Sequence, residues 1–163
     1  MKKIRNLSAQ SLVFNKVIFL IILLTLIFVA FSAVDGADIN ISNSTSGGLN
    51  RTVNQSNSGD RIVLDAGVYT NNVTDIYVYN KNLTIVGKDS KNTIIDARKQ
   101  GRIFYIINSV TLINLTLYNG YAGSSENGGA IFNTGNLTLI NCTFSNNAAY
   151  QGGGVLSLIM VLL

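Results

Sequence analysis

Short apolar runs alternate with polar segments along most of this chain. From Gly59 onward, runs such as 62–64 (IVL), 83–86 (LTIV) and 104–107 (FYII) are separated by segments rich in Asn and Gly. β-Branched and aromatic residues dominate these runs, and none of them keeps a helical period over a useful length, which is typical of short β-strands. The pattern therefore predicts an all-β region.

Two stretches of the chain repeat one another. Residues 110–119 (VTLINLTLYN) match residues 137–146 (LTLINCTFSN), and residues 128–131 (GGAI) match residues 152–155 (GGGV). A fainter copy is found at residues 82–87 (NLTIVG). A short repeat composed only of strands is the signature of a solenoid, in which each coil packs on its neighbours.

The spacing inside the repeat predicts a bend at an asparagine. Leu112 and Leu115 are three residues apart, so a straight strand would point them to opposite faces. A bend at Asn114 restores a common inward face, because Asn tolerates the left-handed backbone conformation better than most residues. The same bend is expected at Asn141, with the two side chains stacked and joined by amide hydrogen bonds. Cys142 takes the place of Leu115 in the second copy and is expected to point inward as a small apolar residue.

These observations predict a parallel β-helix of roughly four to five coils over residues 59–155. Its successive coils would pair in parallel at a spacing of about 4.8 Å around an interior of Val, Leu, Ile, Phe and Ala. Residues 38–58 are rich in Asn, Ser, Thr and Gly, and we interpret them as a polar linker or an N-terminal cap.

The N-terminal pattern indicates an export signal or a membrane anchor. Four basic residues within the first 16 precede an uncharged, mostly apolar run at 17–34. This order is that of a secretory signal peptide, with candidate cleavage motifs at Ala30–Ser32 and Val34–Gly36. The run is also just long enough to span a bilayer, so an uncleaved anchor helix is the alternative. Both interpretations of residues 1–37 place the rest of the chain outside the cytoplasm.

Composition excludes several classes of site. The chain has no His and a single Cys, which excludes an intrachain disulfide, a zinc site of the usual Cys/His kind and a histidine general base. The net charge of +4 arises mainly in the leader, because from Asp38 onward there are eight basic and seven acidic residues. The sequence has no stripe of Lys and Arg with interleaved aromatic residues of the kind that binds nucleic acid. We therefore expect no nucleic-acid partner, no metal and no cofactor.

Two motifs carry a resemblance to known families. Residues 128–131 (GGAI) followed by residues 144–147 (FSNN) resemble the GGA[I/L/V]…FxxN repeat of polymorphic outer-membrane proteins. The string from 59–64 (GDRIVL) through 83–87 (LTIVG) to 94–96 (IID) is similar to adhesin-like surface proteins of methanogenic archaea. The resemblance implies a right-handed parallel β-helix of the pectate-lyase-like superfamily, located at the cell surface. The motif positions in this chain are Gly128, Gly129, Ala130, Ile131, Phe144 and Asn147.

The chain departs from that repeat at its C-terminal end. Where the family pattern implies Asn-x-Gly and another strand, residues 156–163 read LSLIMVLL. This tail is too short for a membrane span, and it lacks the polar cap that the last coil of a solenoid needs. We interpret it as an atypical apolar tail that indicates a truncated reading frame.

Sequons for N-glycosylation are frequent. They occur at Asn6, Asn40, Asn43, Asn50, Asn54, Asn72, Asn82, Asn114, Asn136 and Asn141. The candidates for modification are Asn40, Asn43, Asn50 and Asn54, because they lie in the flexible polar segment. Asn114 and Asn141 are interpreted as corner residues instead, since a stacked asparagine cannot carry a glycan.

The family resemblance also brings an enzymatic alternative. Pectate lyases of this superfamily hold calcium with clustered Asp residues and use an Arg as base. The available residues here are Asp65, Asp75, Asp89, Asp96, Arg98 and Arg102. These Asp residues are scattered singly at turns, where Asp is common for backbone reasons, and no carboxylate pair can be nominated. No catalytic residue is therefore assigned.

The tyrosines are a candidate sugar-binding strip, with strand packing as the alternative. They are Tyr69, Tyr77, Tyr79, Tyr105, Tyr118, Tyr121 and Tyr150.

The sequence thus predicts an exported, non-enzymatic β-helix at the cell surface, with a role in adhesion or envelope structure. Glycans or proteins on the surface of other cells are the expected partners, and the membrane is contacted through the N-terminal segment during export. Two alternatives stay open, namely a polysaccharide lyase or hydrolase and a non-functional truncated fragment.

Overall fold

The computed structural model describes residues 14–19, 36–123, 127–150, 156–157 and 161–162, and the chain divides into two units, Met1–Val34 and Asp35–Leu163. In the first unit, residues 14–19 are helical and their side chains are exposed. Among the described residues, no helix is both long enough and apolar enough to cross a membrane. The predicted leader, including its cleavage motifs, lies mostly outside the described residues, so its role stays a prediction.

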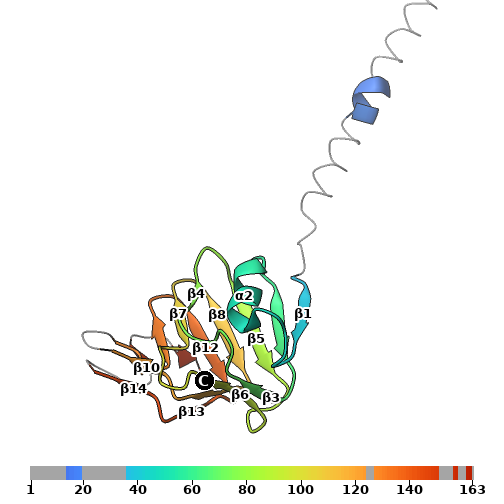
Figure 1. Cartoon of the computed structure of the whole chain (residues 1–163). Coiled ribbons are helices and arrows are strands. Elements are labelled where there is room, and N and C mark those ends of the chain that lie inside the picture. The colour runs from blue at the N-terminus through green and yellow to red at the C-terminus, as the bar shows by residue number, and fades with distance from the viewer. Residues whose placement is uncertain (1–13, 20–35, 124–126, 151–155, 158–160, 163) are drawn as a thin grey trace, which may run out of the picture. The chain divides into compact units, whose positions relative to one another are not determined.

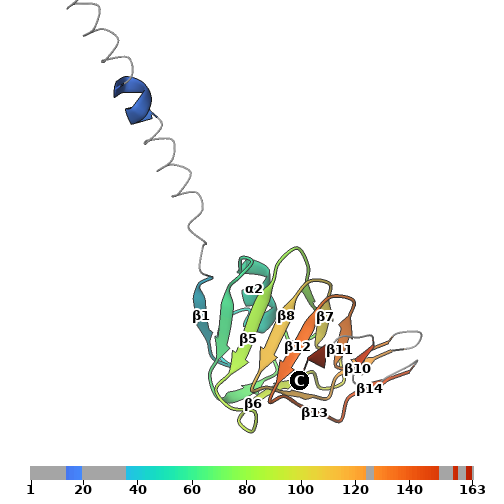
Figure 2. The ribbon, with the colours of Figure 1, turned by 180° about the vertical axis from the view of Figure 1, so that it is seen from behind.

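The second unit is an all-β parallel solenoid of about four turns (Figures 1 and 2). Sheet A contains β1 (Asp38–Ile41), β2 (Arg61–Leu64), β5 (Leu83–Gly87), β8 (Val110–Ile113), β12 (Leu137–Ile140) and β16 (Val161–Leu162). Sheet B contains β3 (Gly67–Tyr69), β6 (Thr93–Asp96), β9 (Thr116–Tyr118) and β13 (Thr143–Ser145). Sheet C contains β4 (Ile76–Val78), β7 (Phe104–Ile106), β11 (Ile131–Asn133) and β15 (Leu156–Ser157). A fourth, two-stranded sheet pairs β10 (Tyr121–Ala122) with β14 (Ala148–Ala149).

The two matched segments of the sequence lie on neighbouring coils. Strand β8 pairs in parallel with β12, with Val110 opposite Leu137 and Leu112 opposite Leu139. On its other side β8 pairs with β5, which contains the fainter copy of the repeat and places Ile85 opposite Leu112. The structure therefore confirms that the coils stack as a parallel solenoid, as the repeat predicted.

The interior is built mainly by alternation of buried and partly buried residues along the short strands. In β8, Val110 and Leu112 are buried, whereas Thr111 and Ile113 are only partly buried. The pattern continues past the corner, because Leu115 is fully buried on the inner side. Consecutive coils thus contribute aliphatic residues to one core, whose burial stabilises the fold by roughly 25 cal/mol per Å² of apolar surface.

The N-terminal end of the solenoid is closed by an ordered cap. Strand β1 pairs with β2, and α2 (Gly48–Gln55) follows it and packs against β4. Leu49 and Val53 on α2 are fully buried in the core, so the helix takes the place that a strand of sheet C takes in later coils. The solenoid therefore begins earlier than the predicted boundary at Gly59, within the segment interpreted as a linker or cap. The sequence signal was weak because β1 offers only two apolar residues, in the order DINI.

A lysine from a later coil holds this cap in place. The Nζ of Lys81 donates hydrogen bonds to the carbonyl oxygens of Val53 (3.1 Å), Asn54 (3.2 Å) and Ser56 (2.7 Å). Carbonyls at a helix C-terminus lack partners within the helix, and the helix dipole makes this end negative. The ammonium group of Lys81 supplies hydrogen-bond donors to these carbonyls and a positive charge at the negative end of the helix.

Strand pairing also extends into the predicted tail. Leu156–Ser157 pairs with β11, and Val161–Leu162 pairs with β12. These short strands continue sheets C and A by one further rung, so part of the segment interpreted as an atypical tail follows the path of the solenoid.

Substitutions on one strand test which side chains face the interior. We expect Leu112→Ala to lower the free energy of unfolding by about 2–5 kcal/mol, because it leaves a cavity in a core that cannot fully collapse. Ile113→Ala, the neighbouring outward position, should cost well under half as much. Urea unfolding of the full chain followed by circular dichroism measures both values, and equal losses would contradict the observed register.

Candidate functional site

The predicted corner asparagines lie directly above one another. Asn114 and Asn141 have positive φ values of 53° and 50°, which is the left-handed conformation that the register break required. The Asn141 side-chain amide donates to Asn114 Oδ1 at 2.8 Å, and the Asn114 backbone N–H donates to the carbonyl of Ile140 at 2.9 Å. Both side chains therefore serve coil stacking.

A second asparagine ladder was not anticipated. Asn119 and Asn146 also have positive φ, and the Asn146 amide donates to Asn119 Oδ1. The Asn119 amide in turn donates to Asp96 Oδ1 at 2.8 Å, which extends the ladder over three coils. The signal was present in the sequence, because Asn119 and Asn146 are the last residues of the two matched segments.

The GGAI and FxxN motif positions also connect coils. Asn147 accepts a hydrogen bond from the Gly120 N–H (2.7 Å) and donates to the carbonyl of Leu117 (3.0 Å) on the preceding coil. Gly128 has a φ of 72°, and a Cβ at this position would lie 2.3 Å from the carbonyl oxygen of Ile131. Ile131 is fully buried. The remaining motif residues, Gly129, Ala130 and Phe144, are buried or packed against the core.

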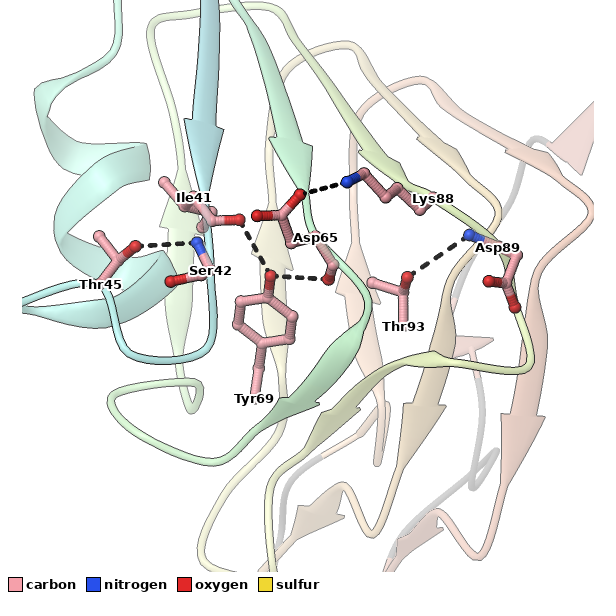
Figure 3. A network of polar contacts seen from close by, with 8 residues as sticks. All are labelled: Ile41, Ser42, Thr45, Asp65, Tyr69, Lys88, Asp89 and Thr93. Atoms are coloured by element: carbon pink, nitrogen blue, oxygen red, sulfur yellow. Dashed lines mark hydrogen bonds and ion pairs between the residues drawn. The ribbon is translucent and has the colours of Figure 1, made fainter.

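A buried tyrosine joins the first two coils (Figure 3). The hydroxyl of Tyr69 lies 3.1 Å from the carbonyl oxygen of Ile41 and 2.9 Å from that of Asp65, and can donate to either. Burial raises the pKa of Tyr69 from 10.0 to about 12, with a further contribution from the nearby Asp65 carboxylate. This tyrosine therefore cannot belong to an exposed strip.

Two of the candidate carboxylates form separate ion pairs. Asp65 lies 2.8 Å from Lys88 Nζ on the solvent side, where such pairs contribute little (Figure 3). Asp75 lies 3.3 Å from Nε of Arg102, whose side chain is only 8% exposed. Asp75 also has a positive φ and accommodates a turn.

The other two candidates accept hydrogen bonds within turns. Asp89 accepts hydrogen bonds from the side-chain amide and the backbone N–H of Asn92, which lower the pKa of its carboxyl group. Asp96 accepts hydrogen bonds from the Arg98 N–H and from the Asn119 amide. Such bonds are the usual reason for Asp at a turn. Within the described part of the chain, no three His, Cys, Asp or Glu side chains come close enough to hold a metal ion.

Cys142 is half-buried and packs against the core, which agrees with the inward position predicted for it. Its Sγ lies 3.3 Å from the carbonyl oxygen of Leu112. Burial raises the pKa of the Cys142 thiol, which disfavours the reactive thiolate form.

The four candidate glycosylation sites differ in accessibility. Asn40, Asn43 and Asn54 are exposed, whereas Asn50 is half-buried and its Oδ1 accepts a hydrogen bond from the Asn54 amide at 3.0 Å. All four belong to the ordered cap or to the loop between β1 and α2 rather than to a flexible linker. Their modification stays a prediction.

An aromatic ladder crosses the outer face of sheet C. The rings of Tyr77 and Tyr105 stack with centroids 4.9 Å apart, and those of Tyr105 and Phe132 lie 4.7 Å apart. The Arg102 guanidinium lies 5.5 Å and 5.6 Å from the centroids of Tyr105 and Phe132. Two of the predicted strip residues thus meet, and Phe132, which the tyrosine pattern could not include, completes the row. Tyr118, Tyr121 and Tyr150 lie on β9, on β10 and after β14, away from sheet C.

A polar row crosses the outer face of sheet A. Thr84, Thr111 and Thr138 occupy opposed positions on β5, β8 and β12. They border a hollow of about 290 Å³ that extends across these strands to the turns that precede them. Its other lining residues are Gly59, Asn82, Leu83, Ser109, Val110 and Asn136.

Comparison of the chain with known proteins gives no matching family model, no matching curated protein and no matching solved structure.

The asparagine corners can be tested by two substitutions at one position. Asn114→Ala should lower the free energy of unfolding by about 2 kcal/mol, because it loses the amide hydrogen bond and puts alanine, which tolerates the left-handed conformation less well than asparagine, at a positive φ. Asn114→Gly should lose less, since glycine adopts positive φ without strain. Chemical denaturation of the full chain measures the difference, and identical losses would show that the backbone conformation is not the reason for asparagine.

Tyr69 predicts a stability change at alkaline pH. Its raised pKa means that the unfolded chain ionises first, so the stabilisation from Tyr69 is full below pH 10 and is lost as the pH rises towards 12. Tyr69→Phe should cost about 1 kcal/mol at neutral pH, and its deficit relative to the unsubstituted chain should shrink between pH 10 and 12. Urea unfolding at each pH tests this, and a constant deficit would exclude the proposed ionisation.

Proposed function

We propose that this chain is an exported cell-surface protein with an adhesive or envelope-structural role and no catalytic role. The observation that carries the proposal is the register of the coils. It aligns like side chains in outward rows across successive coils, such as Thr84, Thr111 and Thr138 on sheet A.

An outward row suits binding or shielding better than chemistry. Solenoids present extended surfaces because each coil repeats the positions of the last. Enzymes, in contrast, bring a few titratable groups together in a concave site and perturb their pKa values. The candidate carboxylates are engaged one by one in turns and ion pairs at separate corners, which supports the non-catalytic interpretation.

Two sequence features support the location. The basic and apolar N-terminal segment has the order of an export signal, and the GGAI and FxxN motifs resemble those of β-helical surface proteins. We propose on these grounds that the chain is an adhesin-like right-handed β-helix. Its partners are then glycans or proteins on other cells.

The proposal is tested by producing the full chain with a C-terminal epitope tag in a host with a single cell membrane. Protease added to intact cells should remove the tag, and the cells should attach more strongly to glycan-coated or cell-coated surfaces than cells without the chain. A variant lacking residues 17–34 is the matched control and should keep the tag protected inside the cell.

Two results would overturn the proposal. One is a tag that stays protected in intact cells carrying the complete chain. The other is release of unsaturated sugar when the full chain is incubated with calcium and a pectate-type polymer, which would establish the lyase alternative.

A further inference from the structure

The end of sheet C nearest the cap contains a small hollow. Strand β4 is the last strand of this sheet, and α2 packs against it where a further strand would otherwise lie. The hollow has a volume of about 200 Å³ and is bordered by the helix, by β4 and by the turn that follows β4. Its lining residues are Asn54, Tyr77, Tyr79, Asn80 and Lys81.

The aromatic ladder ends at this hollow with one ring face uncovered. Tyr105 is sandwiched between Tyr77 and Phe132, so both of its faces are occupied. Tyr77 stacks on Tyr105 on one side only, and Asn54 of α2 lines the hollow on the other side. Tyr77 and Tyr79 are 49% and 55% exposed as whole residues, which makes them accessible to a ligand.

The polar groups around these rings are of two kinds. The three Lys81 contacts with carbonyl oxygens of α2 and its C-cap engage all three protons of its ammonium group. Lys81 therefore holds the wall of the hollow and is poorly placed to bind an anion. The side-chain amide of Asn80, in contrast, makes no hydrogen bond to another described residue, and Asn54 uses one amide proton on Asn50.

An exposed aromatic face beside amide donors and acceptors matches the chemistry of a sugar ring. The C–H face of a pyranose packs on an aromatic ring, and its hydroxyl groups exchange hydrogen bonds with amides. The hollow is below the range of about 300–1,000 Å³ for pockets that enclose drug-sized ligands, so it can take one ring rather than a buried oligosaccharide. None of the described residues that line it carries a carboxylate, which disfavours a cationic ligand.

We propose that this hollow binds the terminal sugar of a glycan, with Tyr77 and Tyr79 as the stacking residues and Asn54 and Asn80 as the hydrogen-bonding residues. The inference rests on the proposed surface function and names the ligand class of that function. Asn54 is also the acceptor of a sequon, and a glycan attached to it would extend from the rim of the same hollow.

The test measures binding of the purified full chain to immobilised glycans that end in neutral hexoses, N-acetylhexosamines or hexuronic acids. We expect binding to at least one of these termini and a loss of about tenfold or more for Tyr77→Ala and for Tyr79→Ala. Tyr77→Phe, which keeps the ring, should retain most of the binding. Tyr121→Ala removes another exposed tyrosine, on β10, and should leave binding unchanged.

Two further variants separate ligand binding from structural effects. Asn80→Asp keeps the shape of the side chain but removes the amide donor, so it should weaken binding while the unfolding midpoint stays within the range of the control. Asn54→Gln keeps an amide but displaces it by one methylene, so in a host that does not glycosylate it should also weaken binding without lowering the unfolding midpoint.

Two outcomes would overturn the inference. The first is no binding to any of the three classes of terminus, and the second is binding that survives Tyr77→Ala combined with Tyr79→Ala. If glycan binding survives in that double variant, the hollow is not the sugar site but the proposed surface function stands. If the complete chain is not displayed outside the cell, the surface function fails whatever the glycan result.

Discussion

Parallel hydrogen bonding between successive coils is the interaction on which the rest of this structure depends. Each strand is only two to five residues long, so none could be stable as an isolated hairpin or pair. Stacking in register joins these short pieces into continuous sheets and places inward aliphatic residues above one another, as with Ile85, Leu112 and Leu139. The same register necessarily aligns the outward residues, which produces the threonine and aromatic rows.

Register in turn depends on the corners. A strand that continued straight past Ile113 would turn its later residues away from the core, and the left-handed backbone at Asn114 prevents this. Asparagine suits the position twice, because it tolerates that conformation and its amide bonds to the corner of the next coil. Asn119 and Asn146 repeat this arrangement at the next corner. Much of the asparagine content of this region is thus explained by coil stacking.

The helix α2 both closes one end of the solenoid and creates the hollow beside Tyr77. A solenoid end exposes apolar side chains and unpaired strand edges unless something covers them. Here α2 covers the first coil, and Lys81 from a later coil anchors its C-terminus. Because a helix does not reproduce the path of a strand, the aromatic row of sheet C stops at Tyr77 and leaves a hollow beside it. This break in the aromatic row is where we place the proposed ligand site.

The sequence by itself determined the parallel solenoid, its repeat and the bends at Asn114 and Asn141. These features follow from local alternation and from a spacing that is visible in two copies, and they need no knowledge of distant contacts. Only the tertiary structure decided that residues 38–58 form a cap, because Ile39, Ile41, Leu49 and Val53 are too few to indicate a buried strand and helix until the first coil supplies their partners. It also decided that Tyr69 is buried while Tyr77 and Tyr105 stack outside with Phe132. Which face a tyrosine takes depends on the register between coils some 25–30 residues apart, and that register is a property of the stacked chain rather than of any single segment.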